Sequence, residues 1–147
     1  MIATFPTQRV AVVPMLFRGR RKRPLILLVE DDHLMADMYS YQLEREGYQV
    51  DVVGDGRQGL DAIRSRHPDL VLLDLRLPVM EGFEVLGNLA GDPGRPPILI
   101  LSNYGDAGMV NRGLALGARD YLVKSATTPI TLAQKVRSIL PPGAPHL

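Results

Sequence analysis

The 147-residue chain has 46% hydrophobic and 22% charged residues, a balance typical of a globular domain, and it is long enough to bury a core. It has no cysteine, which excludes disulfide scaffolds, cysteine-ligated zinc and thiol chemistry, and it has no apolar stretch of membrane-spanning length. Six of the 17 basic residues and none of the 16 acidic ones lie in residues 1–23, so residues 24–147 carry 11 basic against 16 acidic residues, a net charge of −5.

We interpret residues 1–23 as a basic, disordered arm, residues 24–140 as one domain and residues 141–147 as a short tail. A basic arm on an acidic body could contact nucleic acid or anionic lipid. A leader without function, or translation that begins at Met15, is the simpler interpretation. The arm does not read as a signal peptide, because its apolar run from Val10 to Leu16 is short and precedes the main basic cluster.

The first half of the domain alternates between strand and helix patterns. Residues 25–29 form a continuous apolar run, which predicts a strand buried on both faces. Residues 33–46 show helical spacing and end at Gly47, a residue that commonly follows a helix. Residues 48–53 alternate between apolar and polar side chains and predict an edge strand, and residues 55–66 predict a second helix with a capping-box-like start.

The second half repeats this alternation. Strands are predicted at residues 69–75, 97–101 and 120–124, and helices at residues 81–89, 106–116 and 128–140. Alternating strands and helices imply a parallel sheet with helices on both faces. The three fully apolar strands belong in the centre and the two charged strands at the edges. The strand order 2-1-3-4-5 satisfies this requirement and predicts an α/β, flavodoxin-like, doubly wound sheet of five parallel strands with five helices.

In that order the carboxyl ends of the first and third strands lie side by side. Glu30, Asp31 and Asp32 follow the first strand, and Asp74 follows the third. Several carboxylates at one sheet edge repel one another unless some are protonated or a cation lies among them. An all-oxygen donor set favours Mg2+, or Mn2+ in its place.

Two further polar side chains are expected at the same edge of the sheet. Ser102 ends the fourth strand and Lys124 ends the fifth. A hydroxyl, an ammonium and a metal site around one carboxylate are suited to phosphoryl transfer, where positioning and charge stabilisation dominate. Asp74 could then act as the nucleophile and carry the phosphoryl group as an acyl phosphate.

These motifs resemble the receiver domain of two-component response regulators, over about residues 24–140. The segment from Leu77 to Gly82 looks like the loop that follows the phosphoacceptor in this family. The resemblance implies these roles: phosphoacceptor, Asp74; metal ligands, Asp31, Asp32, Asp74 and the backbone carbonyl of Arg76; phosphoryl-binding residues, Ser102 and Lys124; switch residues, Ser102 and Tyr121.

The resemblance further implies a cytoplasmic switch that is phosphorylated by a sensor histidine kinase or a histidine phosphotransfer protein. Its fourth helix, fifth strand and fifth helix would then control a downstream protein partner, or form a homodimer. The chain ends soon after Leu140, so we expect a stand-alone receiver with no DNA-binding domain in this chain. We expect Asp74 to gain and lose its phosphoryl group without turnover of an external substrate. Tyr121 has a simpler interpretation as a static core residue.

Two departures from the family pattern stand out. The family lysine is usually followed by proline, often with a cis bond, whereas Ser125 follows Lys124 here. A non-proline cis bond costs about 3 kcal/mol, so we predict a trans bond and a different loop shape. Arg76 and Tyr104 are bulky residues at two variable positions that flank the phosphoryl site in the family. We expect them to shield the acyl phosphate from water and lengthen its lifetime.

Three other functions compete with this interpretation. A haloacid-dehalogenase-like phosphatase also uses an aspartate nucleophile with Mg2+, but it normally has a second aspartate where this chain has Arg76. A flavin-binding module of the same fold is disfavoured by the acidic switch point and by the absence of tryptophan. A degenerate receiver would bind partners without being phosphorylated.

Overall fold

A five-stranded parallel sheet forms the middle layer of the structure, a computed structural model that describes residues 23–143. The predicted basic arm, apart from Arg23, and the last four residues of the predicted tail lie outside the described residues. The strand order is β3-β2-β4-β5-β6, which confirms the predicted flavodoxin-like order. The strands are β2 (Leu25–Val29), β3 (Gln49–Val53), β4 (Leu70–Leu73), β5 (Ile98–Ser102) and β6 (Asp120–Val123).

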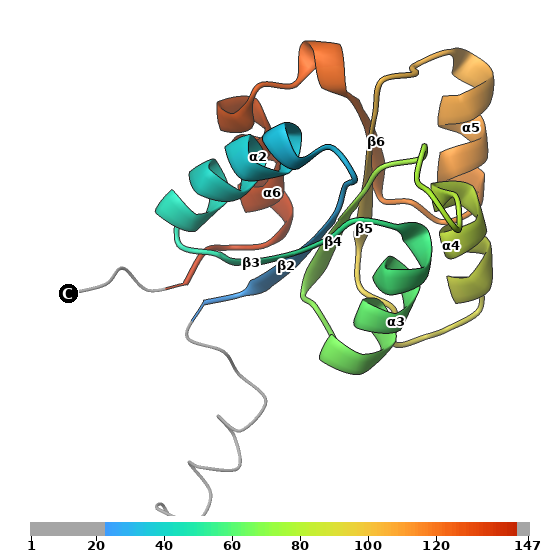
Figure 1. The fold of residues 1–147 in the computed structure, drawn as a ribbon, viewed down its shortest axis with the longest axis horizontal. Helices are drawn as coiled ribbons and strands as arrows, with labels where there is room; N and C mark the ends of the chain where they lie inside the picture. Colours follow the sequence, from blue (N-terminus) through green and yellow to red (C-terminus); the bar gives the residue numbers. More distant parts are fainter. Residues whose placement is uncertain (1–22, 144–147) are drawn as a thin grey trace, which may run out of the picture.

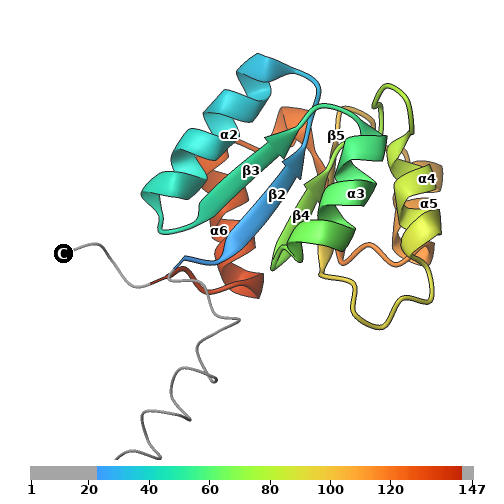
Figure 2. The same cartoon turned by 60° about the horizontal axis from the view of Figure 1, so that its bottom comes forward.

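Five α-helices within residues 23–143 cover the two faces of the sheet (Figures 1 and 2). One face is covered by α3 (Gly56–Arg66), α4 (Gly82–Leu89) and α5 (Ala107–Ala115), and the other by α2 (His33–Arg45) and α6 (Pro129–Ile139). No helix in this part of the chain is both long and apolar enough to cross a membrane.

The core is divided by the sheet into two apolar clusters, because successive side chains of a strand point to opposite faces. Leu27 and Val29 of β2 pack with residues of α3 and α4, whereas Ile26 and Leu28 pack with residues of α2 and α6. Every residue of β2, β4 and β5 is buried, while β3 is half-exposed. The continuous apolar runs therefore marked the central strands correctly.

The loop after β4 approaches the start of α4 closely. Gly82 donates its N–H to the carbonyl of Leu75 at 2.9 Å. A Cβ atom on Gly82 would lie 2.4 Å from the carbonyl oxygen of Asp74, so only glycine fits this position without a backbone shift. The predicted strand over residues 69–75 is observed only at Leu70–Leu73, and Asp74 lies immediately beyond its carboxyl end.

The segment after β6 forms a short 3-10 helix, η1 (Lys124–Ala126), before α6 begins. The side-chain oxygen of Thr128 caps α6 by accepting the N–H of Thr131, and Pro129 occupies the first turn, as predicted. The described residues contain no cis peptide bond, so the bond between Lys124 and Ser125 is trans, which confirms the prediction.

Candidate functional site

The backbone register of the central strands brings Glu30 and Asp74 together. Val29 pairs with Leu73 across β2 and β4, so the next residue of each strand lies at the same edge of the sheet. The N–H of Asp74 donates to the carbonyl of Val29 at 3.1 Å and extends this pairing by one residue. Asp74 is only 6% exposed and Glu30 only 2%. Two carboxylates are thus held side by side in a largely buried position.

The ammonium group of Lys124 lies between these carboxylates. Its Nζ is 2.6 Å from Oε1 of Glu30 and 3.1 Å from Oδ2 of Asp74. Lys124 is 8% exposed, so the three charged groups are screened little by solvent. Buried charges are tolerated in proteins when they are paired in this way. The predicted placement of Lys124 next to Asp74 is observed.

The electrostatics of this group follow from burial and pairing. Burial raises the pKa of the Glu30 carboxyl above its usual value of 4.5; the nearby charge of Asp74 also raises it, and the hydrogen bond from Lys124 opposes the rise. Burial alone would lower the pKa of Lys124. The hydrogen bond to Glu30 and the charge of Asp74 outweigh burial and raise that pKa above 10.5. Lys124 therefore remains a cation at neutral pH.

Asp31 completes an acidic cluster with Glu30 and Asp74. One carboxylate oxygen from each of these residues lies within 4.8 Å of the other two. Three carboxylates lie here against one ammonium, and a divalent cation would relieve the repulsion among them. All-oxygen ligands and an exposed member, Asp31, suit a hard cation that retains some of its water. The donor set therefore fits Mg2+ or Mn2+.

Asp32 differs from the sequence-based assignment. Its Oδ1 accepts the N–H groups of Leu34 and Met35 at 3.0 and 3.2 Å, so this side chain caps α2. The carboxylate that joins Asp31 and Asp74 in the cluster is that of Glu30, which the assignment left out. An aspartate directly before a helix commonly acts as its N-cap, and this signal distinguishes Asp32 from its two neighbours.

Ser102 and Tyr121 are linked through the backbone of Tyr104. Ser102, fully buried at the end of β5, accepts the N–H of Tyr104 on its Oγ at 3.1 Å. The hydroxyl of Tyr121 donates to the carbonyl of the same residue. Tyr121 is 8% exposed and packs in the core with α3, α4 and the strands. The two residues predicted as a switch therefore both hydrogen-bond to the backbone of Tyr104, in the loop after β5.

Arg76 and Tyr104 contact each other beside Asp74. The guanidinium carbon of Arg76 lies 4.5 Å from the centre of the Tyr104 ring, within the range of a cation–π contact. The backbone N–H of Arg76 lies 3.4 Å from Oδ1 of Asp74, so the backbone of Arg76 lies next to this carboxylate. Both side chains are exposed. The two positions that the sequence singled out for shielding thus form one unit.

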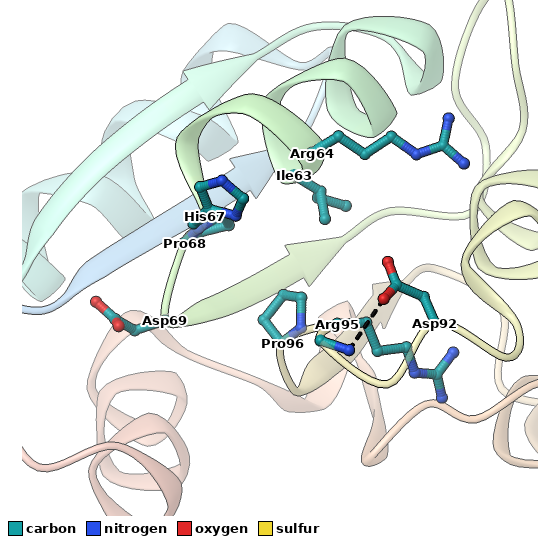
Figure 3. Close-up of a pocket in the computed structure, with 9 residues that line it drawn as sticks. Ile63, Arg64, His67, Pro68, Asp69, Asp92, Arg95 and Pro96 are labelled. Carbon is teal, nitrogen blue, oxygen red and sulfur yellow. Dashed lines mark hydrogen bonds between the residues drawn. The ribbon is translucent and has the colours of Figure 1, made fainter. Parts of the chain in front are cut away.

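A cavity of about 460 Å³ lies at the opposite end of the sheet, where β4 begins (Figure 3). It is lined in part by His67, Asp92 and Arg95. Asp92 accepts the N–H of Gly94, and the guanidinium of Arg95 donates to the carbonyl of Gly117 at 2.7 Å. These polar groups hold loops together, and none of the predicted site residues lines the cavity.

Comparison with known proteins decides the family. Residues 26–137 match the response regulator receiver domain. The chain belongs to the receiver domain family. Receiver domains are the phosphorylation-dependent switches of two-component systems, and phosphorylation of an aspartate with Mg2+ is their norm. The family and the fold class predicted from the sequence are thereby confirmed.

The relatives of this receiver domain include longer proteins. The DNA-binding response regulator MtrA of Mycolicibacterium paratuberculosis is 44% identical over 118 residues, which cover 80% of this chain and 52% of that protein. The chain thus spans about half the length of the curated relatives it matches. The chemotaxis protein CheY4 of Vibrio cholerae is 30% identical with a TM-score of 0.73, over 80% of this chain and 98% of that one. The Mn(2+)-bound form of response regulator Rcp1 is 25% identical with a TM-score of 0.68, over 79% of this chain and 93% of that one.

Proposed function

We propose that this receiver domain accepts a phosphoryl group on Asp74. The observation that carries the proposal is the buried Asp74 carboxylate, held 3.1 Å from the Lys124 ammonium and clustered with the carboxylates of Glu30 and Asp31. In the reaction the phosphorus–nitrogen bond of a phosphohistidine, or the phosphorus–oxygen bond of a small donor, breaks. A carboxylate oxygen of Asp74 forms the new phosphorus–oxygen bond, and the leaving group departs with the electron pair.

The surrounding side chains support this chemistry by position and charge. The Lys124 ammonium, 2.6 Å from Glu30 and next to Asp74, would exchange part of its carboxylate pairing for the phosphoryl oxygens. Ser102 would donate its hydroxyl to the same group from the end of β5, where its Oγ now only accepts a hydrogen bond. Neither residue needs a large movement, because both already lie at this edge of the sheet.

We propose Glu30, Asp31 and Asp74, together with the backbone carbonyl of Arg76, as the residues that hold Mg2+ or Mn2+. When bound, the cation would neutralise charge on the transferring phosphoryl oxygens. The Mn(2+)-bound form of the related Rcp1 supports a divalent cation in this fold. Asp32 takes part indirectly, because its cap fixes the start of α2 next to Asp31.

The signal would leave through the face formed by α5, β6 and α6. Ser102 accepts the N–H of Tyr104 and Tyr121 donates to the carbonyl of Tyr104, so a shift of Ser102 toward a phosphoryl group that moves Tyr104 would disturb both hydrogen bonds. Such a disturbance would shift the equilibrium between two conformations of the face formed by α5, β6 and α6. A downstream protein, or a second copy of this chain, would read the state of that face. The phosphodonor would be a sensor histidine kinase or a histidine phosphotransfer protein, and this receiver domain would meet it in the cytoplasm.

The test is incubation with acetyl phosphate and Mg2+, followed by intact-mass measurement. Wild type should gain one phosphoryl group in Mg2+ and little in excess chelator, and Asp74→Ala should gain none. Asp92→Ala, which removes an exposed carboxylate near the opposite edge of the sheet, should behave as wild type. No gain by wild type under excess donor and metal would favour a degenerate receiver that only binds partners. Steady release of inorganic phosphate from phosphate esters would favour a phosphatase.

A further inference from the structure

The backbone of Lys124 is held by hydrogen bonds from Thr127. The N–H of Thr127 donates to the carbonyl of Lys124 at 3.1 Å, and its hydroxyl donates to the carbonyl of Val123 at 2.7 Å. The residues between them, Ser125 and Ala126, are exposed and supply no side chain to the core. Ser125 also lacks the ring that would fix its backbone φ angle. The orientation of Lys124 therefore depends on Thr127.

Thr127 is in turn tied to the core by Tyr39. The hydroxyl of Tyr39 donates to the carbonyl of Thr127 at 3.1 Å, across 88 residues of sequence. The Tyr39 side chain is 1% exposed and packs in the cluster between α2, α6 and the sheet. Burial raises the pKa of Tyr39 above its usual value of 10.0, so the hydroxyl keeps its proton and remains a donor.

The helix that carries Tyr39 begins directly after the acidic residues of the site. The cap at Asp32 fixes the first turn of α2, and Tyr39 lies two turns further along. One rigid element thus connects the strand end that carries Glu30 to the loop that carries Lys124. The helix α2 therefore links the two segments whose side chains meet in the 2.6 Å contact between Glu30 and Lys124.

We propose that Tyr39 is a positioning residue for phosphoryl transfer and acts through Lys124. Its hydroxyl holds the 124–127 turn in the shape that delivers the ammonium to the two carboxylates, in a loop that no proline fixes. The inference rests on the proposed function, since it concerns the rate at which Asp74 is phosphorylated. It adds a residue that touches neither the phosphoryl group nor the acidic cluster.

The test compares two variants that each delete one buried hydroxyl. Tyr39→Phe removes the hydrogen bond to Thr127. The matched control is Tyr48→Phe, because Tyr48 is fully buried in the same cluster and donates its hydroxyl to the carbonyl of Leu140, outside the 124–127 turn. Tyr39→Phe should be phosphorylated by acetyl phosphate about 3- to 10-fold more slowly than wild type, the effect of one lost hydrogen bond. Tyr48→Phe should be phosphorylated at the wild-type rate, although both variants should unfold at a lower urea concentration than wild type.

A double-mutant cycle separates positioning from a general structural effect. In a Lys124→Met background, Tyr39→Phe should change the residual rate less than twofold, because the group that it positions is gone. If the Lys124→Met protein does not fold, Thr127→Val gives an independent test: it removes the hydroxyl bond to the carbonyl of Val123 and should also slow phosphorylation, whereas Thr127→Ser should keep the wild-type rate. Equal rates for wild type and Tyr39→Phe, or full additivity in the cycle, would overturn the inference and leave the proposed function intact. Failure of wild type to be phosphorylated would overturn the proposed function instead.

Discussion

Removal of the contact between Arg76 and Tyr104 should shorten the lifetime of the phosphoryl group on Asp74. The guanidinium lies 4.5 Å from the ring centre, and the backbone N–H of Arg76 lies 3.4 Å from Asp74, the proposed phosphoacceptor. We expect the two side chains together to limit the approach of a water molecule to the acyl phosphate. Truncation of either side chain opens this approach, and it also frees the remaining partner to move away.

The expected change in the hydrolysis rate of the acyl phosphate follows from the exposure of the Arg76 and Tyr104 side chains. Tyr104 is 42% exposed, and a cation–π contact at an exposed site is worth about 0.5–1 kcal/mol. If this contact holds the shield closed, its loss corresponds to a change of about 2- to 5-fold in the hydrolysis rate constant. The variants are Arg76→Ala, Tyr104→Ala and the double variant. Each is phosphorylated with acetyl phosphate, freed of donor, and followed by intact mass as the phosphoryl group is lost.

The two single substitutions should each accelerate hydrolysis, and the double variant should be little faster than the faster single variant. A matched control is Arg45→Ala, which removes a similar contact with Tyr41, at 5.6 Å, on α2. This control should leave the lifetime unchanged. Fully independent effects of the two substitutions, or lifetimes equal to wild type, would refute the idea that the pair acts as one shield.

Two predictions concern stability and can be checked by urea unfolding. Gly82→Ala should lower the unfolding free energy by about 1–3 kcal/mol, because its Cβ would lie 2.4 Å from the Asp74 carbonyl oxygen. The control is Gly87→Ala in the same helix, where a Cβ would meet no atom of the described residues within 4 Å, its chain neighbours and own helix backbone aside. This substitution should raise the unfolding free energy by up to about 1 kcal/mol. Equal effects would contradict this. The hydrogen bond from Arg137 lowers the pKa of Glu46 below 4.5, so this carboxylate stabilises the fold above that pH and the benefit is lost as pH falls. Glu46→Gln should be slightly less stable than wild type at neutral pH and equal to it in acid; a difference that persists in acid would contradict the assignment.

The fold could be predicted from the sequence because its strongest signals are local. The three apolar runs of the central strands and the half-polar edge strand β3 report burial directly, and the observed strand order follows from them. The strand ends were less well predicted. Leu75 is apolar and buried, yet it lies beyond β4, because the chain bends after Asp74 to begin the loop to α4.

The structure brings Asp31, Asp74 and Lys124 together at one edge of the sheet and places the Asp32 carboxylate in a helix cap. Asp74 and Lys124 lie together because strand order and strand ends determine which residues share an edge. The choice between Glu30 and Asp32 depends on which of two neighbouring carboxylates points into the site. That choice is made by the helix cap, which uses the oxygen of Asp32 for two backbone N–H groups.

Contacts between distant segments could not be derived from the sequence. The hydrogen bond from Tyr39 to Thr127 joins α2 to a loop 88 residues away, and it depends on how α2 and α6 pack. A tyrosine at helical spacing reads equally well as an ordinary core residue. The contact between Arg76 and Tyr104 is similar, because the sequence identified both positions but gave no measure of their mutual distance.

The central claim is that Asp74 is the residue that carries the phosphoryl group. The most direct measurement is digestion of the phosphorylated protein under acidic conditions, followed by mass analysis of its peptides. One modified peptide is expected, the one that contains Asp74, with fragment ions that place the phosphoryl group on that residue. Phosphoryl groups on Asp31 or Glu30 instead, or spread over exposed carboxylates, would contradict it.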